Sequence, residues 1–174
     1  MKTSSLNFLC CPACKGTLDF PESFNTPGTL PEFFCRSCSQ SYSSQNGYPD
    51  FLGDKEIIHK SKWEKTIRNL YAKFYTASTD FMFFFLGGAR NAREEVLNLL
   101  ELKDNSTILE TGMGPGDNFP ILISKARNIK IFAIDIQRQM LIHSLRNTGK
   151  WNIDAELFRA DAEDLPFRDE MFDV

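Results

Sequence analysis

Residues 108–119 read ILETGMGPGDNF, a short apolar run followed by glycines at positions 112, 114 and 116. The apolar run belongs to a buried strand expected over 107–110, and a helix is expected over 119–126, with Pro120 tolerated in its first turn. A glycine loop between a strand and a helix is typical of folds that bind nucleotide-like cofactors. This loop is therefore the starting point for the fold of the whole chain.

The segments after the loop repeat the alternation of strand and helix. We expect a strand over 129–134 that ends in Asp135, a helix over 137–146, and a strand over 155–160 that ends in Asp161. This order is the first half of a doubly wound parallel sheet. The predicted fold class is α/β: a Rossmann-like sheet with strands 1–3 and the start of strand 4, preceded by helices and a small β-rich ribbon.

The residues around the glycines argue against a ligand with phosphate groups. A pyrophosphate needs free backbone N–H groups at a bare helix N-terminus, but Pro115 has no N–H and Asp117 places an anion there. Glu110 adds another acid before the loop, and the third glycine comes too early for the dinucleotide pattern. S-adenosylmethionine (SAM) fits these acids, because it carries a sulfonium and an ammonium group and no phosphate.

Acidic residues also stand at the ends of the predicted strands. Ligands of doubly wound sheets bind outside the carboxyl ends of the strands, where Glu110, Asp135 and Asp161 all fall. Asp135 lies 23 residues after Gly112, close to the spacing of about 20 residues between the loop and the ribose-binding acid in such sheets. We therefore expect the Asp135 carboxylate to accept both ribose hydroxyls.

Four segments resemble, in order and spacing, the first four motifs of class I SAM-dependent methyltransferases of the type 11-like group. They are LETGMGPG at 109–116, Asp135-Ile136, ADAEDLPF at 160–167 and FDV at 172–174. The likeness extends over about residues 65–174. It implies that Asp161 faces the adenine amino group, that Ala162 contacts the ring through its backbone, and that Ile136 packs on the adenine. The expected cofactor-binding residues are Glu110, Gly112, Gly114, Gly116, Asp135, Ile136, Asp161 and Ala162, and no catalytic residue can be named.

Four of the five cysteines form two C-x-x-C pairs, which predict a metal site. Cys11 and Cys14 form the first pair, and Cys35 and Cys38 the second. Each pair presents two thiolates from a tight turn, and two such turns complete the tetrahedron that zinc prefers. Because all four ligands come from protein, we expect a structural site and not a catalytic one. Cys10 is left over and could compete with Cys11.

The sequence around the cysteines resembles the zinc ribbon of the small activator proteins that hold tRNA and translation-factor methyltransferases. The matching segments are CPACKGTL, FFCRSCSQSY and NGYPDFL, within about residues 8–53. Asn46-Gly47 predicts a hairpin turn in this ribbon. The resemblance implies a module that can also be fused to a methyltransferase, and the ribbon is a candidate surface for a protein partner.

Three domains are predicted: a zinc ribbon over 1–54, a helical linker or lid over 55–105, and an incomplete SAM-binding Rossmann-like methyltransferase domain over 106–174. The middle segment holds the aromatic run FMFFFL at 81–86. We interpret this run as packing between layers, or as an apolar lid over a substrate. Because the strand expected from 171 stops at Val174, we expect the chain to belong to a longer protein, or to be completed by another chain.

Composition limits the possible functions. A net charge of −3 and an isoelectric point near 5.4 argue against nucleic acid as the main partner. No segment reads as a signal peptide or a membrane span, so a cytoplasmic location is expected. The predicted function is methyl transfer from SAM, to a small apolar molecule in preference to ribosomal RNA and with no role for DNA. A non-enzymatic zinc-ribbon scaffold is the alternative from another class.

Overall fold

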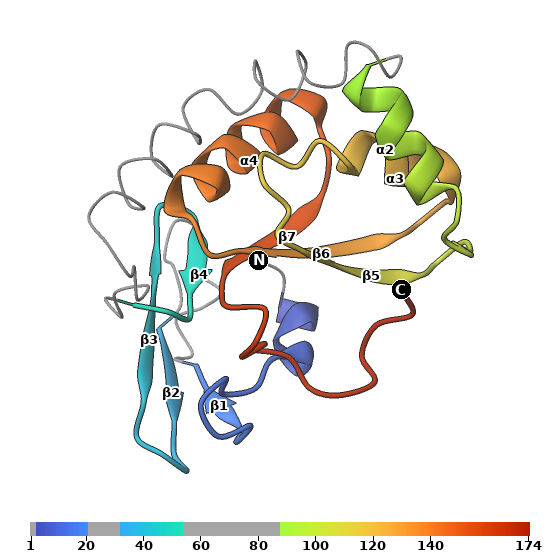
Figure 1. Ribbon diagram of the computed structural model, residues 1–174. Helices are drawn as coiled ribbons and strands as arrows, with labels where there is room; N and C mark the ends of the chain where they lie inside the picture. Colours follow the sequence, from blue (N-terminus) through green and yellow to red (C-terminus); the bar gives the residue numbers. More distant parts are fainter. Residues whose placement is uncertain (1–2, 21–31, 54–87) are drawn as a thin grey trace. The chain divides into compact units, whose positions relative to one another are not determined.

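The computed structural model describes residues 3–20, 32–53 and 88–174 (Figure 1). The chain divides into two compact units, one made of 1–53 with 103–174 and the other of 54–102. In the second unit the described part includes helix α2 (Ala89–Leu97), which lies within the helical segment predicted over 55–105. Leu99 and Leu100 donate to carbonyls three residues back, so the last turn tightens and the α-helix stops. The expectations for 55–87, including the aromatic lid, lie outside the described residues.

A single seven-stranded sheet runs through the first unit, in the order β1-β2-β3-β4-β7-β6-β5 (Figure 1). One part is antiparallel and comes from the cysteine ribbon: β1 (Leu18–Asp19), β2 (Phe33–Cys35), β3 (Ser41–Gln45) and β4 (Tyr48–Asp50). The other part is parallel: β5 (Thr107–Thr111), β6 (Lys130–Asp135) and β7 (Ala155–Arg159).

The parallel part confirms the predicted α/β fold class. Its strands lie in the order β7-β6-β5, as expected for the first half of a doubly wound sheet, and all but the first residue of β6 are buried, as is usual for a strand covered on both faces. Helix α3 (Phe119–Lys125) follows the glycine loop and helix α4 (Arg138–Trp151) follows β6. The second helix is longer than predicted because it continues through Gly149 and ends only at Asn152, which has a left-handed φ of 54°.

The ribbon forms its hairpin where Asn46-Gly47 predicted it. These two residues join β3 to β4 with φ angles of 52° and 96°. Positive φ at both positions suits the right-handed twist of the strands, and asparagine and glycine tolerate it best. The sequence prediction of this turn is confirmed.

The ribbon and the parallel strands are joined edge to edge, which the sequence did not predict. Asp50 of β4 pairs in parallel with Arg159 of β7, and the Phe51 N–H donates to the Arg159 carbonyl at 2.9 Å. The ribbon thus pairs with the last residue of β7, at the edge of the parallel part of the sheet.

Aromatic side chains form a core shared by both parts of the sheet. Residues Thr3–Phe8 form the 3₁₀ helix η1, whose last residue, Phe8, stacks on Phe132 of β6 with ring centroids 4.6 Å apart. Phe132 also lies near Phe158, Phe167 and Phe172, at 6.1, 5.9 and 5.5 Å. Such ring pairs add to the apolar area that they bury. The ribbon and the parallel strands therefore share a hydrophobic core, which includes Phe33 and Phe51 of the ribbon.

The last residues of the chain lie beside β5, the first strand of the parallel sheet. The Asp173 N–H donates to the Thr107 carbonyl at 2.8 Å, and the Leu109 N–H donates to the Val174 carbonyl at 2.9 Å. The segment makes these hydrogen bonds without forming a regular strand.

Candidate functional site

The glycine loop has a backbone that only glycines adopt easily. Gly112, Gly114 and Gly116 have φ angles of 66°, 56° and 83°, in the left-handed region that L side chains rarely occupy. A Cβ at Gly116 would lie 2.6 Å from the Phe119 ring, whereas a Cβ at Gly112 would meet nothing within 4 Å. The loop is therefore packed at Gly116 and open at Gly112, where a ligand could approach the backbone.

Asp135 holds the glycine loop against the second parallel strand. Its Oδ2 accepts the Gly114 N–H at 2.9 Å, and its Oδ1 accepts the Gln137 N–H at 2.8 Å. Burial raises the pKa of this carboxyl above its ordinary value, although the surrounding N–H groups favour the charged form and partly oppose the rise. Each oxygen has a second lone pair, so hydroxyl donors can still bind.

Glu110, at the end of β5, is joined to the start of helix α3. Asn118, the residue before the helix, donates through Nδ2 to Glu110 Oε1 at 2.9 Å. Sequence reasoning did not identify Asn118, because a polar residue before a helix indicates only a cap. The side chain of Glu110 is half-buried at the carboxyl end of its strand.

The end of β7 is the third strand end at the carboxyl edge of the parallel sheet. The Ala160 N–H donates to the Asp135 carbonyl at 3.3 Å, which places Asp161 directly after this contact. Asp161 is half-buried and its Oδ1 accepts the Glu163 N–H at 3.0 Å, while Ala162 is exposed. Ile136 is half-buried beside Asp135. The structure thus gathers the predicted loop and strand-end residues at the carboxyl edge of β5, β6 and β7.

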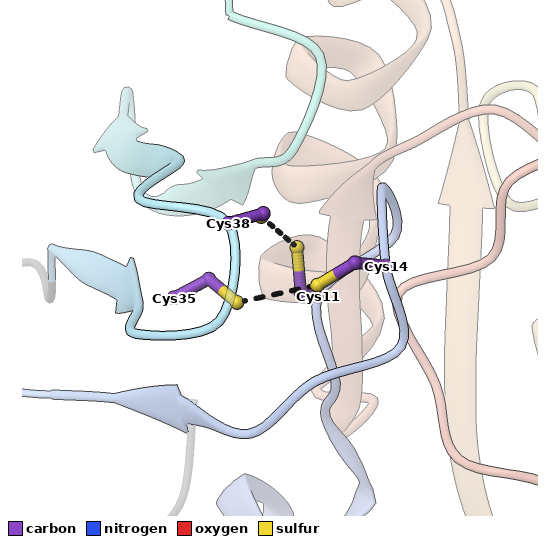
Figure 2. Close-up of side chains that lie close together, drawn as sticks. All are labelled: Cys11, Cys14, Cys35 and Cys38. Carbon is purple, nitrogen blue, oxygen red and sulfur yellow. Dashed lines mark hydrogen bonds between the residues drawn. The ribbon is translucent and has the colours of Figure 1, made fainter.

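The four predicted metal ligands lie together. Their sulfur atoms are all within 4.8 Å of one another, and Figure 2 shows Cys11 opposite Cys38, at 3.6 Å, and Cys14 opposite Cys35, at 3.5 Å. A zinc ion with Zn–S distances of about 2.3 Å separates its sulfurs by about 3.8 Å. The number, chemistry and spacing of these donors therefore fit zinc.

The two cysteine turns have the same local geometry. Cys11 N–H donates to the Gly16 carbonyl and Cys35 N–H to the Gln40 carbonyl, at 2.9 Å each. Burial opposes the ionisation of Cys35, but N–H groups of its own turn and the neighbouring thiols lower its pKa to about 6. A thiolate is the form that binds a metal. The Tyr42 hydroxyl lies 3.2 Å from Cys11 Sγ, a contact that the sequence did not reveal.

The first cysteine turn also contacts the segment that follows Asp161. The Cys10 N–H donates to the Pro166 carbonyl at 3.0 Å, and Lys15 Nζ donates to the Leu165 carbonyl at 2.7 Å. These bonds connect the metal-ligand candidates to the loop expected to hold adenine.

None of the helices in the described ranges is long and apolar enough to cross a bilayer.

Three comparisons with known proteins bear on this arrangement. A family described as "Methyltransferase domain" matches residues 108–174. The ubiquinone/menaquinone biosynthesis C-methyltransferase UbiE of Rickettsia prowazekii (strain Madrid E) is 39% identical over 141 residues, which cover 72% of this chain and 53% of that protein. The chain therefore spans about half the length of this curated relative.

Two solved structures are similar over part of the chain. A SAM-dependent methyltransferase from Aquifex aeolicus is 28% identical with a TM-score of 0.42, covering 47% of this chain and 44% of that one. A complex between the Haloferax volcanii Trm112 methyltransferase activator and a methyltransferase is 20% identical with a TM-score of 0.46, covering 59% and 44%.

Proposed function

We propose, because residues 108–174 match a family described as a methyltransferase domain, that the protein is an enzyme that transfers a methyl group from SAM to an acceptor. One observation carries this proposal: the glycine loop is hydrogen-bonded to the strand-end acid Asp135 in a site whose acids disfavour phosphate. A cationic cofactor without phosphates suits this electrostatic environment.

We assign the two ends of the cofactor to different parts of the sheet edge. Glu110 and the open backbone at Gly112 would hold the methionine end, and the Asp135 carboxylate would accept the ribose hydroxyls. Ile136 and Ala162 would contact the adenine ring, with Asp161 facing its amino group. The half-buried state of Ile136 and Asp161 and the exposure of Ala162 support this assignment, because each can still be reached by a ligand.

The chemistry of the step belongs to the cofactor, which supplies an electrophilic methyl group on a sulfonium. The protein contributes orientation: the rigid loop and Asp135 hold the cofactor in one pose, so that an acceptor can attack in line. Gly116, Phe119 and Ser144 are packed too closely for the loop to shift easily. Catalysis by positioning needs little from these residues beyond holding the cofactor in one pose.

For the acceptor we propose a small apolar molecule. The relative with 39% identity is named for a C-methylation in quinone biosynthesis, which agrees with an apolar acceptor. Ribosomal RNA is a weaker candidate because the chain has a net charge of −3. A scaffold without enzyme activity is weaker still, since it gives no reason for acids after all three parallel strands, at Glu110, Asp135 and Asp161.

We also propose that the four cysteines bind one structural zinc ion. All four tetrahedral positions would be filled by thiolates, which leaves none for a substrate or a water molecule. The metal would hold together β-strands of two to five residues, which are too short to be stable alone. The ribbon also presents a surface on which a protein partner could bind.

Replacing Asp135 by alanine is expected to weaken the binding of S-adenosylhomocysteine (SAH), the product form of the cofactor, by about 10- to 100-fold. This range corresponds to hydrogen bonds to a charged group, worth about 1.5–3 kcal/mol in total. Calorimetric titration of the zinc-loaded protein measures the change. Asp154→Ala is the control, because Asp154 is exposed and precedes the amino end of β7, whereas the candidate site lies at the carboxyl ends of the strands. Equal affinities of Asp135→Ala and the wild type would refute the ribose assignment.

The pH dependence of SAH binding is expected to include the titration of Asp135. Burial raises its pKa, so protonation in the free protein begins at a higher pH than for an ordinary aspartate. Affinity should therefore fall as the pH is lowered through this raised pKa, because the protonated acid accepts hydroxyl bonds poorly. The free energy of unfolding depends on pH in the opposite sense. Burial disfavours the charged form of Asp135, so this free energy falls as the pH rises through the same pKa. Titrations at several pH values should show a step in the wild type that Asp135→Ala lacks.

A further inference from the structure

A buried ion pair joins the ribbon to the parallel sheet. Asp50, the last residue of β4, is fully buried, and Arg159, the last residue of β7, is 5% exposed. Arg159 Nη1 donates to both carboxylate oxygens of Asp50, at 3.1 and 2.9 Å. The same carboxylate accepts the N–H groups of Leu52 and Gly53 at 3.0 and 2.9 Å. Its orientation is therefore fixed by several hydrogen bonds.

The same guanidinium also binds the backbone next to Asp135. Arg159 Nε donates to the Ile136 carbonyl at 3.1 Å. Ile136 directly follows Asp135, and these two residues carry the proposed ribose and adenine contacts. The planar guanidinium thus connects Asp50 of the ribbon with the backbone of Ile136. Its N–H groups point in fixed directions.

Burying this ion pair costs more free energy of desolvation than burying an apolar contact would. A buried ion pair contributes little net stability, because desolvation offsets its attraction, so apolar residues could have filled the same space. The presence of such a pair is better explained where it fixes the position of functional groups. Here it fixes the backbone at Asp135 and Ile136, which we call the Asp135–Ile136 corner.

We propose that Arg159, oriented by Asp50 of the ribbon, is a positioning residue for the adenosine half of the cofactor. It holds the Ile136 carbonyl, and with it the Asp135–Ile136 corner, in the pose that accepts ribose and adenine. This inference rests on the proposed function and names a role for the ribbon within it. Arg159 does not itself contact the cofactor.

The test uses the conservative variant Arg159→Lys in the zinc-loaded protein. A lysine ammonium can still pair with Asp50, but it cannot at the same time donate to Ile136 in the direction of Nε. Affinities for SAH and for 5′-methylthioadenosine, which lacks the amino-acid end, are measured by calorimetry. Arg168→Lys is the matched control, because Arg168 Nε also donates to a backbone carbonyl, that of Leu9, outside the site.

Arg159→Lys is expected to weaken the binding of both ligands by the same factor, about 5- to 20-fold. This factor corresponds to the loss of one hydrogen bond of about 1–1.8 kcal/mol. Arg168→Lys should leave both affinities unchanged. Glu110→Gln should weaken SAH and spare 5′-methylthioadenosine, since it acts at the methionine end. A merely structural role would shift the unfolding midpoint of Arg159→Lys without changing either affinity of the folded protein.

A measurement on the wild type covers the case in which the variant does not fold. The Arg159 Nε–H resonance is followed by NMR during titration with SAH, with that of Arg168 as reference. A shift of the Arg159 signal alone supports the proposal, and no shift at saturation overturns it. If the wild type binds neither ligand, the proposed function itself fails. If it binds both and Arg159→Lys binds them equally well, only the positioning role fails.

Discussion

Replacing Cys35 by serine is expected to abolish zinc binding and to unfold the ribbon together with the parallel strands that share its core. The free energy of zinc binding, about 10–16 kcal/mol in small zinc domains, is also folding free energy where the apo form has little structure. Serine is a poor zinc ligand, and Cys35 is fully buried among the other ligands. The zinc content per chain and the circular dichroism of the purified variant give the result.

Cys10→Ser is the matched control for this change. Cys10 is also buried, but it lies outside the sulfur cluster, so the Cys10→Ser variant should keep one zinc ion per chain. A Cys35→Ser protein that retains a full equivalent of zinc would contradict the metal site.

Replacing Asp50 by alanine is expected to lower the free energy of unfolding by about 3–5 kcal/mol. The change leaves the Arg159 guanidinium buried without its counter-charge, which is the costly way to break such a pair. Urea denaturation of the zinc-loaded protein measures the loss. The ribbon and the parallel strands share a core, so both should unfold in a single transition.

Asp19→Ala provides the comparison for an exposed ion pair. Asp19 pairs with Arg36 on the ribbon surface, where 40% and 81% of the two side chains are exposed. Solvent screens this pair, so its loss should cost less than about 1 kcal/mol. Equal losses for Asp19→Ala and Asp50→Ala would show that the buried pair does not join the two parts as described.

Local signals predicted the parallel part of the fold well. The glycine loop, the period of the apolar runs and the acids after each run were enough to place β5, β6 and β7 and the helices between them. The two C-x-x-C pairs were likewise enough to bring four sulfurs together. In each case the residues that make the feature lie close in sequence, so the pattern is visible along the chain.

The junction between β4 and β7 could not be predicted in this way. Its partners, Asp50 and Arg159, are 109 residues apart, and their pairing depends on backbone hydrogen bonds that leave no periodic trace in the sequence. In the sequence, Asp50 stands out only as part of the segment NGYPDFL. Arg159 could have been noticed as a charged residue at the end of an otherwise apolar half-strand, since such a charge needs a partner when buried.

We propose that the sheet edge at Glu110, Asp135 and Asp161 binds SAM. Calorimetric titration of the zinc-loaded wild-type protein with SAH measures this binding. We expect saturable binding of one ligand per chain, which Asp135→Ala weakens by about 10- to 100-fold. The absence of any binding at ligand concentrations of about 1 mM, a dissociation free energy of only about 4 kcal/mol, would contradict it.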